Sequence, residues 1–190
     1  MSQAETVPEA RLRNPADIPL QTIGVATDFS ETAGLALSYG AAVVGQFGGS
    51  LHVLHVLHEA GLSALHPDDA ACFESARGYF NQPEENGPQA ERSLQDSVRN
   101  FLERVERGTN ERLQTLTSSA LLANLKIVTA IRYGSPVDEI CDYVRQNAID
   151  LLVLGTHGHR GINHFLIGSV AERVVRASPC PVLTVRLPRS

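Results

Sequence analysis

Apolar runs alternate with amphipathic stretches along most of the chain, and each pattern predicts one type of element. Short runs rich in apolar and β-branched residues predict five strands, at 23–26, 50–57, 125–131, 150–154 and 181–186. Apolar positions three or four residues apart predict helices at 32–47, from 89 onwards, at 137–146 and at 170–177. Strands that alternate with helices need crossover connections. The pattern therefore predicts an α/β fold with an open, Rossmann-like parallel sheet of five strands and helices on both faces.

Two segments lie outside this alternation. Residues 1–19 carry prolines and charges without an apolar period, which predicts a flexible N-terminal tail. Residues 58–88 are rich in Pro, Asn, Gly and acidic residues, which predicts an insertion within a single domain at 20–187. In the long helix after the insertion, one apolar stripe is expected to face the core: Leu94, Val98, Phe101, Leu102 and Val105.

Composition narrows the class of protein. The chain has 190 residues, of which 43% are hydrophobic and 19% charged, and its net charge of −5 offers no basic surface for nucleic acid. No apolar segment reaches the ~18 residues that span a membrane, and the N-terminus lacks the apolar stretch of a signal peptide. Cys72, Cys141 and Cys180 are odd in number and far apart, which argues against a disulfide framework and favours a reducing, cytoplasmic location.

Glycine and serine residues follow the fourth predicted strand in the pattern G-x-x-G-x9-G-S, realised as Gly155, Gly158, Gly168 and Ser169. Ligands of open parallel sheets bind beyond the carboxyl ends of the strands, and Gly155 directly follows such an end. Gly168 and Ser169 begin the next helix, where unpaired N–H groups and the helix dipole favour an anion. The pattern therefore predicts two donor-rich turns that clamp a polyphosphate.

Asp28 follows the carboxyl end of the first predicted strand, so it is expected to face the same crevice. A carboxylate there suits a ribose hydroxyl or a bridging metal ion, and a role as helix cap is the alternative for Asp28. The motifs GxxxxGK[ST] and GxGxxG are absent, which argues against a P-loop NTPase and a dinucleotide-binding protein.

The histidines do not predict a metal site. His52 and His55 lie three positions apart in a predicted strand and therefore point to opposite faces. His157 and His159 lie in a glycine-rich loop without a cysteine or carboxylate close in sequence. A structural or phosphate-contacting role is expected for these side chains.

The glycine pattern resembles the ATP-binding signature of the universal stress protein family. The segments VATDFS, LHVLHV and SVAERVVRASPCPVLTVR extend the resemblance over most of 21–57 and 125–187. The resemblance implies that Ala26, Thr27 and Asp28 lie against the nucleoside and that the backbone of Val56 holds adenine. It further implies two sets of contacts to the ribose and phosphates: Leu154, Gly155, His157 and Gly158 in the loop, and Gly168, Ser169, Val170 and Ala171 at the helix start.

The resemblance also implies that the ligand is ATP, with magnesium, and that two copies of the chain form a homodimer through strand 181–186. The nucleotide state of this homodimer is expected to modulate an unknown stress-response partner. The residues do not distinguish ATP from cyclic AMP as the bound nucleotide. The chain has no evident general base at the site and one lysine, Lys126, so binding is expected rather than turnover, with at most slow ATPase activity. The alternatives are a nucleotide-processing enzyme of the same fold, such as an adenylyl transferase, and a family member that has lost nucleotide binding.

Overall fold

The structure is a computed structural model that describes residues 14, 17–58, 88–156 and 168–188. Within the helical residues 88–98, Asp96 is the one residue whose side chain is described. Five strands form its sheet: β1 (Thr22–Ala26), β2 (Ser50–Leu57), β3 (Lys126–Tyr133), β4 (Leu151–Gly155) and β5 (Val182–Val185). Their order is β3-β2-β1-β4-β5, and every neighbouring pair is parallel. The predicted α/β fold with a five-stranded parallel sheet is confirmed.

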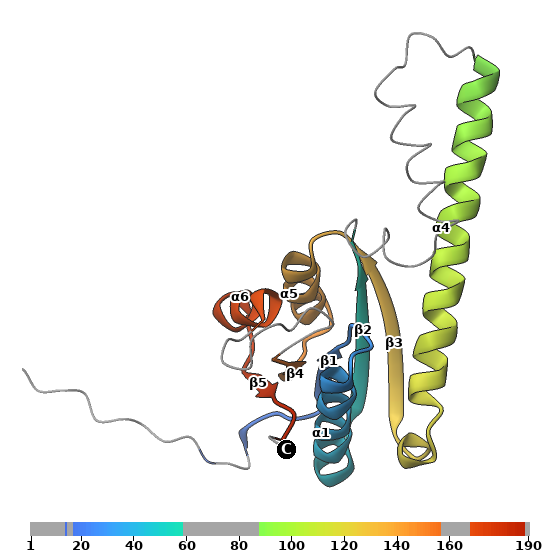
Figure 1. Ribbon diagram of the computed structural model, residues 1–190. Helices are drawn as coiled ribbons and strands as arrows, with labels where there is room; N and C mark the ends of the chain where they lie inside the picture. The colour runs from blue at the N-terminus through green and yellow to red at the C-terminus, as the bar shows by residue number, and fades with distance from the viewer. Residues whose placement is uncertain (1–13, 15–16, 59–87, 157–167, 189–190) are drawn as a thin grey trace, which may run out of the picture.

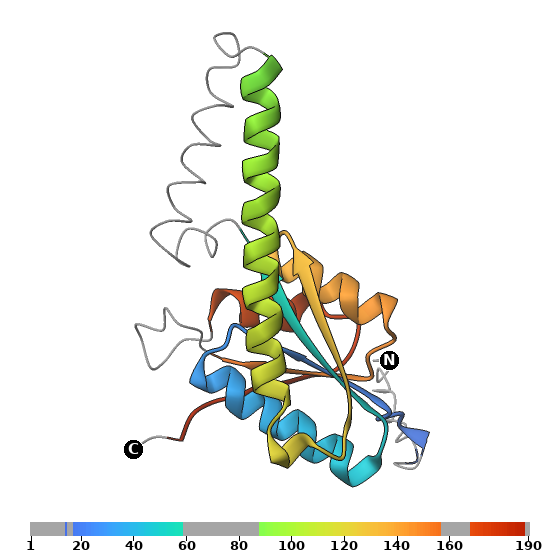
Figure 2. The ribbon, with the colours of Figure 1, turned by 90° about the vertical axis from the view of Figure 1, so that its right-hand side faces the viewer.

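Helices cover both faces of the sheet (Figures 1 and 2). On one face lie α1 (Glu31–Phe47) and α4 (Pro88–Thr117), and on the other lie α5 (Pro136–Gln146) and α6 (Ser169–Ala177). The alternation of side chains along each strand divides the core into two main clusters. On β4, for example, Val153 packs with α1, whereas Leu152 and Leu154 pack with α5 and α6.

The turn from α1 into β2 depends on two glycines, which directly follow the predicted helix 32–47. Gly48 caps α1 with φ 81°, and its N–H donates to the carbonyl of Val44. Gly49 has φ 101°, and a Cβ at this position would lie 2.0 Å from the carbonyl oxygen of Gln21. That oxygen accepts a hydrogen bond from Ser50 N–H at 2.8 Å, so Gly49 allows β2 to start directly beside β1.

Asp150 ties the start of β4 to the start of β1. Its Oδ2 accepts hydrogen bonds from the N–H groups of Gln21 and Thr22, each at 2.9 Å, and its own N–H donates to the carbonyl of Thr22. The sequence pattern predicts Asp150 as the first residue of the strand. In the structure it precedes β4 and acts as a carboxylate clamp between two chain segments that are 128 residues apart.

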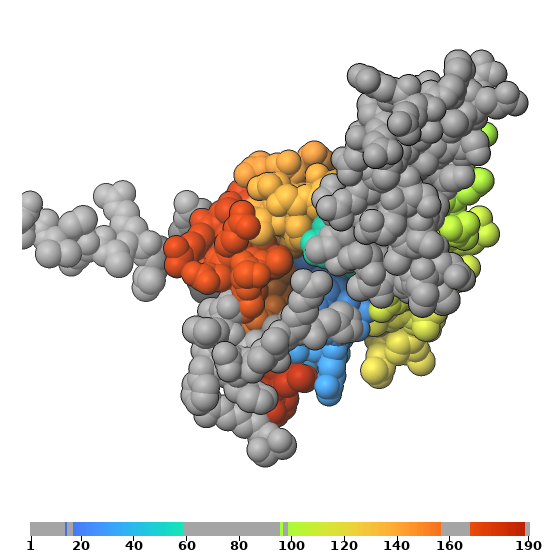
Figure 3. All heavy atoms as spheres, turned by 45° about the horizontal axis from the view of Figure 1, so that its top comes forward, coloured from blue at the N-terminus to red at the C-terminus, as the bar shows by residue number. Residues whose placement is uncertain are grey.

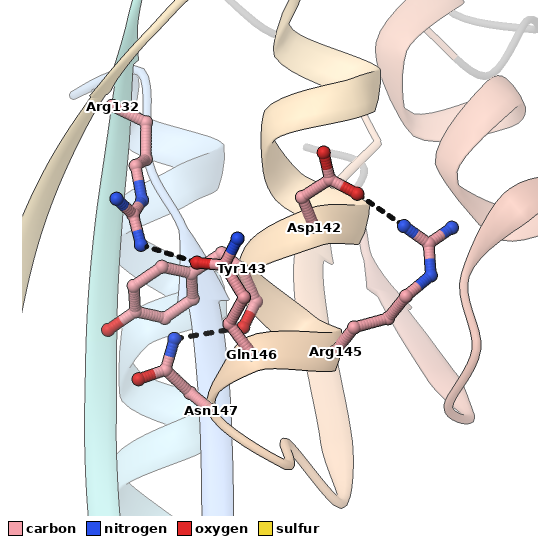
Figure 4. Close-up of polar contacts among 6 residues, drawn as sticks. All are labelled: Arg132, Asp142, Tyr143, Arg145, Gln146 and Asn147. Carbon is pink, nitrogen blue, oxygen red and sulfur yellow. Dashed lines mark hydrogen bonds and ion pairs between the residues drawn. The ribbon is translucent and has the colours of Figure 1, made fainter.

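Polar side chains anchor α5 to β2 and β3 (Figure 4). Arg132 of β3 donates to Gln146 Oε1 at 2.9 Å, and its guanidinium lies 5.3 Å from the ring centre of Tyr143. The Tyr143 hydroxyl lies 2.9 Å from Nδ1 of His52 on β2. Burial, and secondarily the charge of Lys126, lowers the pKa of His52, so this imidazole is neutral at neutral pH.

The long helix α4 continues through Gly108, and its N-terminal half extends beyond the carboxyl ends of the strands (Figures 1 and 2). Phe101 and Val105 are buried against Leu57 of β2, as the apolar stripe predicts. Leu102 is 38% exposed, so the prediction that it faces the core is wrong. Leu102 follows the buried Phe101 by one residue, and its side chain therefore points away from the sheet. The side chains of Leu94 and Val98 lie outside the described part. No described helix is long and apolar enough to cross a membrane.

Candidate nucleotide site

The sheet order places a switch point between the ends of β1 and β4, where the sequence predicts the ligand crevice. The chain leaves β1 for α1 on one face of the sheet and leaves β4 for α6 on the other. Neighbouring strands whose connections diverge in this way form the switch point at which parallel sheets bind ligands. Ala26 and Leu154 are register partners, so the two strands end side by side. Figure 3 is turned toward this edge and shows the blue β1–α1 region and the teal end of β2 between α6 and α4.

The turn after β1 is fixed by its own polar groups. Thr27 is buried, its N–H donates to the carbonyl of Leu54 at 2.8 Å, and its hydroxyl accepts from Phe29 N–H at 3.0 Å. Asp28 Oδ1 accepts from Ser30 N–H at 3.0 Å. The N-cap of α1 is Ser30, whose hydroxyl accepts from the N–H of the third residue beyond it. The cap role considered for Asp28 therefore belongs to Ser30.

The main chain of Val56 extends past the end of β1. The last register pair of β1 with β2 is Ala26 with Leu54, whereas β2 continues to Leu57 beside β3. The Leu54 carbonyl points toward β1, because it accepts from Thr27 N–H. Main-chain groups alternate sides along a strand, so the N–H and C=O of Val56 point to the same side, into the space beyond the end of β1.

Gly155 is the last residue of β4 rather than the first residue after it. A Cβ at this position would lie 3.0 Å from Thr32 Cγ2 and 3.2 Å from Ala33 N, in the first turn of α1. Close packing of α1 on β4 thus accounts for glycine at position 155 without any ligand. Contact of the Gly155 backbone with a ligand stays a prediction.

Thr156 and Gly168 hold the start of α6 next to the end of β4. Thr156 is almost fully buried, its N–H donates to the carbonyl of Val185 at 2.8 Å, and its carbonyl accepts from Gly168 N–H at 2.6 Å. Gly168 is the N-cap of α6 and has no side-chain cap. Its carbonyl accepts the first helical hydrogen bond, from Glu172 N–H at 2.9 Å.

Three residues form the first turn of α6: Ser169, Val170 and Ala171. The N–H groups of a first helical turn have no acceptor within their own helix, and the helix dipole makes this end positive. The N-terminus of α6 can therefore bind an anion beside the end of β4. His157 and Gly158, which complete the expected loop contacts, lie outside the described residues.

A stack of three side chains beside Asp28 does not follow from the sequence motifs. Nδ1 of His55 lies 2.7 Å from the carbonyl oxygen of Thr27, and the His55 and Phe29 ring centres are 4.6 Å apart. The guanidinium of Arg112, from α4, lies over the Phe29 ring, 4.0 Å from the ring centre. We call Arg112, Phe29 and His55 the Phe29 stack. One signal was available: His55 stands near the end of its predicted strand, at the edge where ligands bind.

The opposite orientations predicted for His52 and His55 are confirmed, because His52 contacts α5 and His55 contacts the β1–α1 turn. Within residues 17–58, 88–156 and 168–188, no group of three His, Cys, Asp or Glu side chains could hold a metal ion.

Comparison with known proteins gives a consistent family. A model described as the universal stress protein family matches residues 19–186. Universal stress protein MJ0531 of Methanocaldococcus jannaschii is 39% identical over 79 residues, which are 42% of this chain and 46% of that protein. Universal stress protein MJ0577 of the same organism is 26% identical over 160 residues, which are 84% of this chain and 91% of that protein.

The fold is also shared with a solved structure. Universal stress protein UspA from Lactobacillus plantarum superimposes with a TM-score of 0.56 at 24% sequence identity. The match covers 88% of this chain and 98% of that one.

Proposed function

This chain belongs to the universal stress protein family, and we propose that it binds ATP in the crevice between the carboxyl ends of β1 and β4. The observation that carries the proposal is the position of the glycine signature. It starts at Gly155, the end of β4, and ends at Ser169, the first residue of α6, beside the switch point of the sheet. Glycine-rich connections from a strand to a helix N-terminus are a recurrent way to bind phosphate.

The phosphates would contact the first turn of α6. Ser169, Val170 and Ala171 offer main-chain N–H groups there, and Ser169 adds a hydroxyl. The hydrogen bond from Gly168 N–H to the Thr156 carbonyl supports this role, because it orders the helix start before a ligand arrives. His157 and Gly158 would complete the clamp from the loop side.

The nucleoside would lie over the ends of β1 and β2. The outward N–H and C=O of Val56 supply one donor and one acceptor, which suit the acceptor and donor that adenine carries on its edge. Ala26 and Thr27 would lie beneath the nucleoside, and Asp28 would accept a hydrogen bond from a ribose hydroxyl or hold magnesium. Magnesium is commonly bound by one or two carboxylates together with substrate phosphates, so a single carboxylate fits. It would neutralise phosphate charge.

We assign the chain a binding rather than an enzymatic role. Main-chain N–H groups and one hydroxyl hold ground-state phosphates, and the Asp28 carboxylate is assigned here to the ribose or to magnesium rather than to the activation of a nucleophile. In this proposal the nucleotide state of a homodimer changes its interaction with a stress-response partner. We further propose that the protein lies in the cytoplasm, in keeping with the free state of Cys141 and Cys180 in the described part of the chain.

Protein purified without added ligand is expected to release ATP, identified by mass spectrometry, and to retain it with magnesium for many minutes. Turnover is expected to stay well below the ~1 per second that marks the low end of typical enzymes.

Asp28→Ala should weaken ATP binding about tenfold through loss of one hydrogen bond to a charged group, measured by calorimetry. Asp142→Ala, which removes an exposed carboxylate on α5, serves as the control and should leave affinity unchanged.

Two results would contradict this reading. A folded chain that binds no adenine nucleotide would refute the proposed function. Sustained turnover near the enzyme range, abolished in Asp28→Ala without loss of ATP affinity, would instead make Asp28 catalytic and favour a nucleotide-processing enzyme.

The proposed homodimer would form by pairing of β5 with its copy. β5 is an edge strand. The carbonyls of Pro181 and Val185 accept from β4 and from the residue directly after it, so the main-chain groups of Val182 and Thr184 point outward. Leu183 is 37% exposed and available for the interface, whereas Val185 is already buried in the single chain.

Thr184→Pro is expected to convert the dimer to a monomer. Proline would remove an N–H that faces away from β4, so the single chain should keep its fold while the pairing with a second copy is lost. Light scattering at micromolar concentration measures the change. A wild-type monomer, or a dimer that survives Thr184→Pro unaltered, would reject pairing through β5.

A further inference from the structure

The Phe29 stack joins three elements at the edge of the crevice. His55 comes from β2, Phe29 from the turn after β1, and Arg112 from α4, and the contacts are 4.6 Å between the rings and 4.0 Å from guanidinium to ring. Cation–π contacts of this length are attractive, and so are tilted pairs of aromatic rings. The stack therefore fixes the turn from the side of α4, at the edge where Asp28 lies.

His55 fixes both neighbours of Asp28. Its Nδ1–H donates to the carbonyl of Thr27, the residue before Asp28, and its ring packs on Phe29, the residue after it. A carbonyl oxygen only accepts hydrogen bonds, so Nδ1 must carry the proton. Asp28 is thus the middle residue of a tripeptide that is held at both ends by one imidazole.

Phe29 needs this support. Its φ is 64°, in the left-handed region that bulky side chains rarely adopt. Such a conformation persists where the surrounding structure imposes it, and residues of this kind cluster at binding sites. The rings and the guanidinium of the Phe29 stack supply the packing that holds it.

The charges around the stack are consistent with a neutral imidazole. Burial is the main cause that lowers the pKa of His55, and the nearby charge of Arg112 lowers it further. The hydrogen bond to Thr27 and the charge of Asp28 raise the pKa, and His58 lowers it. At neutral pH His55 is therefore a neutral donor, and the guanidinium and the carboxylate are the charged groups beside it.

We propose that His55, supported by Phe29 and Arg112, is a positioning residue that sets the pose of Asp28 for the bound nucleotide. The inference rests on the proposed nucleotide site. It also connects α4 to that site, because Arg112 of this helix packs on Phe29. His55 itself acts on the nucleotide only through Asp28.

A double-mutant cycle on ATP affinity, measured by calorimetry on the full chain, tests the proposal. His55→Leu is expected to weaken binding about tenfold, but less than about threefold when Asp28 is already alanine, because residues that act through one another are not additive. His55→Asn places an amide N–H close to the position of the imidazole Nδ1–H and should restore most of the affinity. Arg112→Ala should cost about threefold, with the same lack of additivity.

Matched controls separate positioning from general destabilisation. His52→Leu removes a histidine of the same strand that bonds to Tyr143 on the opposite face, and Arg107→Ala removes an exposed cation of the same helix. Both should leave ATP affinity unchanged. If His55→Leu does not fold, the cycle of Arg112→Ala with Asp28→Ala decides, because Arg112 is exposed.

Each outcome has one meaning. Equal losses from His55→Leu in the wild-type and Asp28→Ala backgrounds would overturn the proposal and leave His55 a structural residue. Unchanged affinity in the His55 and Arg112 variants, with ATP still bound by the wild type, would overturn only this inference. A folded wild type that binds no ATP would overturn the proposed function, and this inference with it.

Discussion

Replacement of Gly168 by valine is expected to weaken ATP binding at least 100-fold, about 2.7 kcal/mol, while the fold is kept. Gly168 is the N-cap of α6, and a side chain there would occupy the volume in which the phosphates meet the first helical turn. Its φ of −57° and ψ of 147° lie in a region open to every residue, so valine imposes no backbone strain. Calorimetry measures affinity, and circular dichroism confirms the fold.

A graded companion tests the same helix start. Ser169→Ala removes one hydroxyl donor to a charged group and should cost about 1.5–3 kcal/mol of binding free energy. Gly45→Val, at an exposed position on α1 where an added Cβ meets no atom within 4 Å, is the control and should leave affinity unchanged. A folded Gly168→Val protein with wild-type affinity would show that phosphate does not bind at α6.

The Gly49→Ala variant is expected to lose at least about 3 kcal/mol of free energy of unfolding. The positive φ of 101° alone costs an alanine about 1–3 kcal/mol, and the overlap with backbone adds to it. The added Cβ would lie 2.0 Å from the Gln21 carbonyl oxygen and 2.7 Å from its carbon, and neither atom belongs to a side chain that could turn away. Urea denaturation measures the loss.

Gly45→Ala gives the matched comparison for this prediction. Gly45 lies within α1 with free space around it, so alanine should stabilise the helix by roughly 0.5–1 kcal/mol. A Gly49→Ala protein with wild-type stability would mean that the turn between α1 and β2 can move away from Gln21.

Periodicity predicted the elements because it depends on local sequence. β2 has the predicted bounds, and the start of α6 at Ser169 lies one residue before the predicted start. The parallel arrangement of the strands followed from the alternation, because a strand that leads into a helix and then into another strand needs a crossover connection.

Contacts between distant segments could not be predicted. The sequence gives no sign that the Asp150 carboxylate binds the main chain before β1, because that contact joins residues that only the folded sheet brings together. The reason for glycine at position 155 could not be predicted either. The sequence suggests that a ligand requires it, whereas the structure shows that the first turn of α1 leaves no space for a side chain there. The Phe29 stack needs three elements in place, so no motif contains it.

The central place of β1 sets the order in which this chain can fold. β1 can pair early with β2, the next strand in the chain, but its other edge pairs with β4, more than 120 residues later, and the Asp150 clamp joins residues 128 apart. Contacts this far apart in sequence close slowly. A nascent chain that has not yet reached β4 therefore exposes the open edge of its central strand, which is the kind of surface that chaperones shield.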